Sequence, residues 1–213
     1  MSIYESFKEV ISSLGMEQIT HPIFSCSPIG IRFNIGNNGN EAYIDRPGGE
    51  SLVNPNYITA CLERCLSIYH SLRSEPDILA IDGYLYENET VEDFIADVVS
   101  ATDLPQPNEI KSELSHDDED EFINVLLLWR LNAFKPNKLL EEIIKADMGS
   151  GNSFLTSSVY FICTKDNVLF HLYDDRGADL VADKKEKISH VYRRFNHFIL
   201  DYDRERTDDI FKL

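Results

Sequence analysis

Apolar positions along the chain follow two periods, one typical of helices and one typical of strands. Residues spaced three and four apart predict helices over 2–15, 56–72, 90–98, 136–144 and 183–199. Alternating or continuous apolar runs predict strands over 29–35, 42–44, 77–86, 110–114, 122–129, 159–163, 168–173 and 178–182. Ser2 and Glu5 have the spacing of a capping box for the first helix. Asn56 is expected to cap the second helix, and Asp183 with Glu186 the last.

The order of these elements predicts an α+β fold with a largely antiparallel sheet and packed helices. The last three strands should form a meander followed by a helix, because Asp166-Asn167 and Asp175-Arg-Gly177 are typical tight turns. Arg46-Pro-Gly-Gly49 should end the amino-terminal strand unit. We expect residues 1–213 to form a single domain. Two packed lobes, 1–147 and 153–213, are the alternative, because the segment between them is rich in glycine.

Composition narrows the class of protein. Hydrophobic residues make up 43% of the chain, which excludes disorder throughout. The formal net charge of −17 argues against nucleic acid and anionic membranes, since both are bound through clustered Lys and Arg. The amino terminus has no signal-peptide pattern, and no apolar run approaches the length of a membrane span. We therefore expect a cytoplasmic protein whose four cysteines are reduced.

The negative charge is concentrated in one segment. Between Asp77 and Glu121 stand fifteen acidic residues and a single base, Lys111, which together account for −14 of the net −17. Such a patch can steer a basic protein partner towards it. Its densest part is the predicted partner-binding site, which consists of Asp117, Asp118, Glu119, Asp120 and Glu121. The alternative is a solubilising face, or an edge strand protected by charge.

The common catalytic and nucleotide-binding motifs are absent from the sequence. Neither glycine-rich loop has phosphate-binding spacing, and there is no GxSxG, HExxH or EF-hand pattern. Cys61 and Cys65 lie four residues apart, which fits two small core residues or half of a metal site. His171 lies in a strand, where a pair with Cys163, or with Asp174 or Asp175, would be needed for catalysis. No cofactor is predicted.

A second group of carboxylates follows the predicted strand 168–173. Asp174, Asp175 and Asp179 lie within six residues of one another, with Arg176 among them, and Asp201 and Asp203 follow the last predicted helix. Carboxylate oxygens are the ligands that Mg²⁺ prefers, so these residues are a possible metal site. The simpler interpretation is a tight turn. In that turn Gly177 has positive φ, Asp174 accepts backbone amides and Arg176 pairs with an aspartate.

The same residues carry a family resemblance. The segments Phe170-His-Leu-Tyr-Asp-Asp-Arg-Gly-Ala-Asp179 and Ile199-Leu-Asp-Tyr-Asp-Arg-Glu205 resemble the bacterial family catalogued as domain of unknown function 3885. Gly30-Ile-Arg-Phe-Asn-Ile-Gly36 is similar to its amino-terminal half. The resemblance implies that the two carboxyl-terminal segments contact each other, arginine to aspartate, as a structural clasp of Asp174, Asp175, Arg176, Asp179, Asp201 and Asp203.

Two functions follow as hypotheses. The first is a non-enzymatic protein-binding module. Small acidic bacterial proteins of this style are similar to immunity proteins, so the partner would be a basic, nuclease-type toxin. The second is a metal-dependent phosphoesterase or nuclease built on the cluster from Asp174 to Asp179. The sequence leaves the oligomeric state open.

Overall fold

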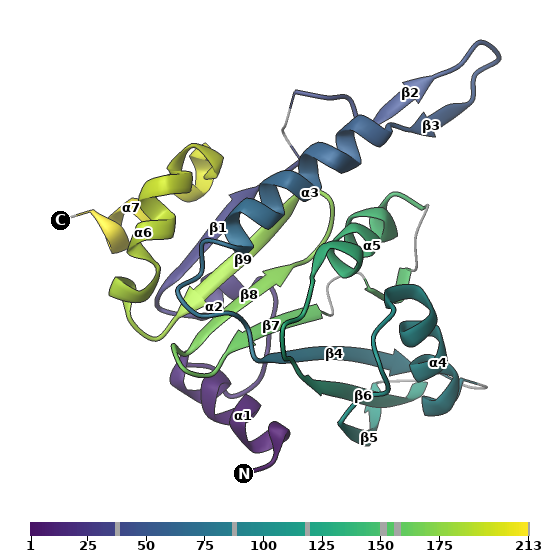
Figure 1. The fold of residues 1–213 in the computed structure, drawn as a ribbon, viewed down its shortest axis with the longest axis vertical. Helices are drawn as coiled ribbons and strands as arrows, with labels where there is room; N and C mark the ends of the chain where they lie inside the picture. Colours follow the sequence, from purple (N-terminus) through teal and green to yellow (C-terminus); the bar gives the residue numbers. More distant parts are fainter. Residues whose placement is uncertain (37–38, 87–88, 118–119, 150–152, 156–158, 213) are drawn as a thin grey trace.

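The computed structural model describes residues 1–36, 39–86, 89–117, 120–149, 153–155 and 159–212. The fold is α+β, as predicted, and is built on a seven-stranded sheet with the order β1-β9-β8-β7-β4-β6-β5 (Figure 1). Every neighbouring pair in this sheet is antiparallel. Its strands are β1 (Gly30–Asn34), β4 (Ile78–Leu85), β5 (Glu109–Asp117), β6 (Asp120–Arg130), β7 (Val159–Cys163), β8 (Val168–Leu172) and β9 (Gly177–Ala182). Strands of both predicted lobes therefore share one sheet.

Helices pack on both faces of this sheet. The α3 face carries the larger apolar cluster, in which sheet residues such as Phe161 and Phe170 meet α3 (Pro55–Tyr69), α4 (Val91–Thr102), α5 (Asn137–Asp147) and α6 (Lys185–Phe195). The α1 face carries a smaller cluster around Leu128 and Leu169, covered by α1 (Ile3–Ser13) and α2 (Ile23–Cys26). Because side chains alternate between the faces of a strand, the five inner strands β9, β8, β7, β4 and β6 supply both clusters.

Local signals account for several helix boundaries. The capping box of α1 is present, since Ser2 Oγ accepts the Glu5 N–H and Glu5 Oε2 accepts the Ser2 N–H at 2.8 Å. The cap of α3 is Asn54, not Asn56. The side chain of Asn54 accepts the Asn56 N–H at 3.0 Å, and Pro55 occupies the first helical position, which suits its fixed φ.

The predicted cap of α6 is also wrong. Its N-cap is Lys184, which makes no capping hydrogen bond through its side chain. The Asp183 carboxylate instead pairs with Lys187 at 2.6 Å and accepts the Asn167 side-chain amide at 3.2 Å. Asp183 thus ties the start of α6 to the β7–β8 turn.

Among the described strands and α-helices, one strand and two helices were not predicted. Arg46-Pro-Gly-Gly49 does not end the amino-terminal unit. It is a turn between β2 (Tyr43–Asp45) and β3 (Ser51–Val53), which form a separate ribbon that projects beyond the start of α3 (Figure 1). Helix α2 is too short to give a periodic signal. Helix α7 (Asp201–Phe211) buries three polar residues, Asp203, Thr207 and Asp208, and one apolar residue, Phe211. Hydrophobic spacing therefore does not reveal this helix.

The described residues contain no helix with both the length and the apolar character required to cross a bilayer.

Candidate functional sites at the two ends of the sheet

The acidic segment forms one end of the sheet. It supplies β4, α4 and the edge strand β5, at the opposite end from α6 and α7 (Figure 1). Within the described part of the chain, β5 pairs on one side only, with β6. The exposed acidic side chains of this segment are Glu89, Glu92, Asp93, Asp97, Asp103, Glu113 and Glu121.

Of the predicted partner-binding residues, Asp117, Asp120 and Glu121 lie where the paired strands β5 and β6 approach their connection. The backbones of Asp117 and Asp120 face each other across the two strands. Asp118 and Glu119 lie outside the described residues. Glu121 is exposed, and its carboxylate lies 3.4 Å from His116 Nδ1. The described members of the predicted site, Asp117, Asp120 and Glu121, are thus brought together by the pairing of β5 with β6.

The same acidic segment also exposes apolar side chains. Tyr84 is 58% exposed and Leu114 57%, and Tyr86 and Ile110 are also exposed. The rings of Tyr84 and Tyr86 lie 5.7 and 6.1 Å from the ring of Phe122. Apolar contacts within a charged rim are typical of protein-binding surfaces. We call Tyr84, Tyr86, Ile110, Glu113, Leu114 and Glu121 the acidic edge. Its members lie on both faces of the sheet, since Tyr84 and Glu113 are on the α1 face and Ile110, Leu114 and Glu121 on the α3 face.

The second group of carboxylates begins in the turn between β8 and β9. The carboxylate of Asp174 accepts the Arg176 backbone N–H at 2.8 Å through one oxygen and the Arg176 Nε–H at 2.8 Å through the other. The predicted turn and its Asp–Arg pair are therefore present. Gly177 does not have positive φ. A Cβ at Gly177 would lie 1.9 Å from the Tyr173 hydroxyl, so glycine is required by close packing.

Asp175 faces the α3 face of the sheet. Its carboxylate accepts the Tyr57 O–H at 2.5 Å, and burial raises the pKa of this carboxyl group. Asp147, at the end of α5, joins the group, because one ligand atom each of Asp147, Asp174 and Asp175 lies within 4.8 Å of the others. Sequence reasoning missed Asp147, which is contributed by another helix. A cation here would compete with Arg176, which occupies both oxygens of Asp174.

Asp179 belongs to a different group, on the α1 face. Its buried carboxylate accepts two hydrogen bonds from Arg32 of β1, at 2.9 and 3.3 Å, and one from the Phe24 N–H at 3.2 Å. The Arg32 guanidinium also lies against two rings, 4.2 Å from the centre of Phe24 and 5.2 Å from that of Tyr173. Burial raises the pKa of Asp179, and Arg32 opposes that rise. Sequence analysis did not single out Arg32.

Helix α7 approaches the same group. Asp203 is buried, and its pKa is raised by burial and lowered by the charges of Arg32 and Arg206. Arg206 lies 5.0 Å from the centre of the Phe24 ring and donates to the Ser27 carbonyl at 3.2 Å. We call Phe24, Arg32, Asp179, Asp203 and Arg206 the Arg32 cluster. It joins α2, β1, β9 and α7.

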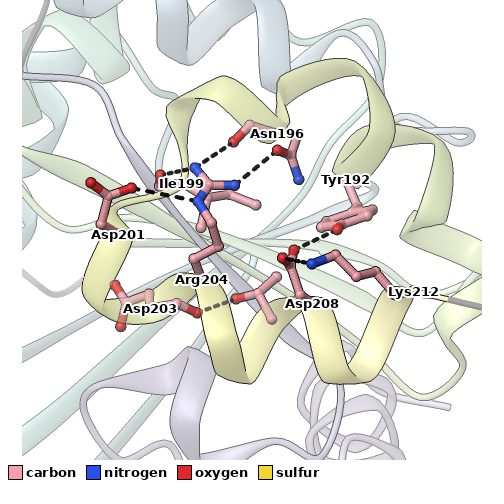
Figure 2. A network of polar contacts seen from close by, with 9 residues as sticks. Tyr192, Asn196, Ile199, Asp201, Asp203, Arg204, Asp208 and Lys212 are labelled. Carbon is pink, nitrogen blue, oxygen red and sulfur yellow. Dashed lines mark hydrogen bonds and ion pairs between the residues drawn. The ribbon is translucent and has the colours of Figure 1, made fainter.

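Asp201 and Arg204 take part in a third network, within the carboxyl-terminal helices (Figure 2). Arg204 donates to the Asn196 side chain at 2.9 Å and to the Ile199 carbonyl at 2.7 Å, and it pairs with the exposed Asp201 at 3.5 Å. These contacts satisfy carbonyls at the turn between α6 and α7. Figure 2 also shows Asp208 accepting the Tyr192 O–H, at 2.6 Å.

A family model described as a domain of unknown function (DUF3885) matches residues 5–203. The chain belongs to the DUF3885 family. No curated protein and no solved structure matches it. The family match spans both sheet edges and runs from α1 into the first turn of α7, so it includes the acidic edge and all of the Arg32 cluster except Arg206.

In this DUF3885 chain, the two carboxyl-terminal segments, 170–179 and 199–205, are connected through a residue that the resemblance did not imply. Arg176 pairs with Asp174 and, at 3.6 Å, with Asp147, whereas Arg204 stays within its own turn. Asp179 and Asp203, one from each segment, both lie near Arg32, and although burial lowers the pKa of Arg32, their negative charges raise it. The residue that connects the segments is therefore contributed by the amino-terminal half of the DUF3885 domain.

The proposed pair of Cys163 and His171 is excluded by the sheet. Cys163 faces Val168 across β7 and β8, whereas His171 faces Tyr160, so the two side chains lie on opposite faces. His171 is buried against the rings of His21 and Tyr160, with centroids 5.0 and 5.1 Å away. Asp174 and Asp175 have Arg176 and Tyr57 as partners. Cys61 and Cys65 are both fully buried in the core of the DUF3885 domain, among apolar side chains.

Proposed function

We propose that this chain is a protein-binding module that captures a basic partner at the acidic edge, and that the partner is a nuclease-type toxin which it neutralises. The observation that carries the proposal is the open outer side of β5, where exposed apolar residues lie among acids. An open strand offers backbone hydrogen bonds to an extended segment of a partner. The exposed aromatic rings supply contact area, and the acids supply steering and selection by charge.

The charge distribution supports this choice of partner. Outside residues 77–121 the chain is close to neutral, with a net charge of about −3. A basic protein approaching the molecule is therefore attracted to one end of the sheet rather than to its whole surface. Nuclease-type toxins have basic surfaces because they bind a phosphate backbone.

Reversing two charges tests the acidic edge. The double variant Glu113→Lys/Glu121→Lys should bind a basic nuclease encoded beside this gene at least about tenfold more weakly at low salt, with a smaller salt dependence. Calorimetry at two salt concentrations measures both effects. The matched control is Glu63→Lys/Glu205→Lys, which makes the same charge change at exposed positions of α3 and α7. Equal losses in both variants, or none, would contradict a site at this edge.

The metal-dependent phosphoesterase remains the second candidate, on the single observation that Asp147, Asp174 and Asp175 converge. Because Arg176 already neutralises Asp174, we expect about 5 mM Mg²⁺ or Mn²⁺ to change the melting temperature by less than about 1 °C. Thermal denaturation with Asp147→Asn as the control measures this. A larger shift that disappears in Asp147→Asn would favour the metal site instead.

A further inference from the structure

A cavity of about 470 Å³ lies on the α1 face, between α1 and the β4-β6-β5 part of the sheet. Its walls are formed by apolar and aromatic side chains, among them Tyr4, Phe7 and Ile11 of α1, and Leu126 of β6. Its volume is within the range that small organic ligands occupy in proteins. Because α1 and α2 cover only part of the α1 face, this region of the sheet is left as a hollow.

Two carboxylates line the sheet side of this cavity, Asp82 of β4 and Glu113 of β5, and of these only Asp82 is partly buried. Asp82 interrupts the apolar run of β4 and lies opposite Leu126 of β6. Its carboxylate accepts the Tyr160 O–H at 3.2 Å, and the Tyr160 oxygen lies 3.3 Å from His21 Nε2. Tyr160 is buried, so this hydrogen bond fixes Asp82 at the cavity wall. Burial raises the pKa of Asp82 to about 7.

The remaining charges around the cavity come from three segments. Glu17 follows α1, Glu113 belongs to β5, and Lys8 and Lys111 face them from α1 and β5. Lys111 pairs with Glu109 at 3.1 Å, and both lysines lie near the Tyr4 ring, at 5.8 and 5.1 Å from its centre. The acids on the lining outnumber the lysines, and one lysine already has an anionic partner.

We propose that this cavity binds a small organic cation, in which a basic nitrogen on an apolar ring or chain pairs with the Asp82 carboxylate. The apolar body would lie against Phe7, Ile11 and Leu126. The charge of the ligand follows from complementarity, because a partly buried carboxylate next to apolar walls is stabilised by a desolvated cation. The cavity shares Tyr84 and Glu113 with the acidic edge, whereas Asp82 lines the cavity alone, so Asp82 is the residue whose substitution tests this proposal separately from partner binding.

A matched pair of probes tests the charge requirement. We expect 2-phenylethylamine to bind the full chain at pH 8. NMR chemical-shift changes at Asp82, Tyr84 and Ile11 measure this binding. The neutral 2-phenylethanol, which has the same ring and chain, should bind at least about tenfold more weakly. Asp82→Asn should abolish this preference, whereas Asp93→Asn, an exposed change on α4, should retain it. Equal binding of the two probes, no binding of the amine, or an unchanged preference in Asp82→Asn would overturn the proposal.

The pH dependence supplies a second measurement. The titratable and charged groups facing Asp82 are Tyr160, Tyr84, Glu17, Glu113, Lys8 and Lys111, with His21 reached through Tyr160. Since the amine requires the ionised carboxylate, its affinity should fall by about thirtyfold between pH 8 and pH 5.5. The hydrogen bond from Tyr160 lowers the pKa of Asp82, so Tyr160→Phe should move this transition to higher pH. A pH-independent affinity in both proteins would overturn the role of Asp82.

The same carboxylate predicts a pH-dependent stability in the absence of ligand. The pKa of Asp82 in the folded chain lies above its ordinary value, so its contribution is fully present below about pH 4 and is lost as the pH rises through about 7. Asparagine is uncharged, like the protonated carboxyl group, so Asp82→Asn does not lose stability as the pH rises. Thermal melts should therefore show the advantage of Asp82→Asn over wild type growing by about 5 °C between pH 5 and pH 8. A constant difference would show that Asp82 does not titrate in this range.

Discussion

Replacing Arg32 by methionine should lower the free energy of unfolding by about 4 kcal/mol, because the change leaves the Asp179 carboxylate buried without its cationic partner. Asp179 is 1% exposed, and Arg32 donates two of the hydrogen bonds that it accepts. The same substitution removes the guanidinium from the Phe24 and Tyr173 rings. Urea unfolding measures the loss.

The matched control for Arg32 is Arg193→Met, which removes the same charge at an exposed position of α6 and should change stability by less than about 0.5 kcal/mol. Without Arg32 the pKa of Asp179 rises further, so the defect should be larger at pH 8 than at pH 5. Adding Asp179→Asn to Arg32→Met should restore part of the stability. A double variant no more stable than Arg32→Met would show that the lost packing, and not the buried charge, sets the cost.

Replacing Gly30 by alanine should cost about 3 kcal/mol, since the new methyl group has no space. A Cβ on Gly30 would lie 2.3 Å from the Phe24 carbonyl oxygen and 2.8 Å from the Phe24 Cα. These are backbone atoms, and α2 is held in place because the Phe24 N–H donates to Asp179. Thermal and urea unfolding of Gly30→Ala measure the effect.

Gly39→Ala provides the comparison for Gly30. Nothing lies within 4 Å of a Cβ built there, but φ is +86°, so this variant carries only the backbone cost, about 1 kcal/mol. If Gly30→Ala is no worse than Gly39→Ala, α2 can move away from β1, and the Arg32 cluster is less rigid than its contacts indicate.

The two ends of the sheet can be tested separately. The Arg32 cluster joins elements at the β1 edge, whereas the acidic edge lies at β5, with five strands between the two edge strands. A charge reversal at the acidic edge should leave the urea unfolding of the chain nearly unchanged, because exposed charges contribute little to stability. Gly30→Ala and Arg32→Met should lower the free energy of unfolding, and neither changes a charge at β5.

The sequence by itself determined the elements whose signals are local. The capping box at Ser2 and Glu5, the strand at 122–129 and the three-strand meander all depend on neighbouring residues, and all are present. The Asp174–Arg176 pair was predictable for the same reason, because it forms within one turn. The family resemblance also came from contiguous segments and is confirmed over residues 5–203.

Only the tertiary structure decided which distant residues meet. Arg32 and Asp179 are 147 positions apart, and their pairing depends on the position of β1 beside β9 at the edge of the sheet. Asp147 joins Asp174 through the placement of α5, and Asp82 acquires a cavity because α1 covers part of one face. Strand order and the packing of helices are set by the summed burial of many side chains, which no local pattern records. The sequence therefore specified the parts and the concentration of charge, while packing decided the Arg32 cluster, the acidic edge and the cavity.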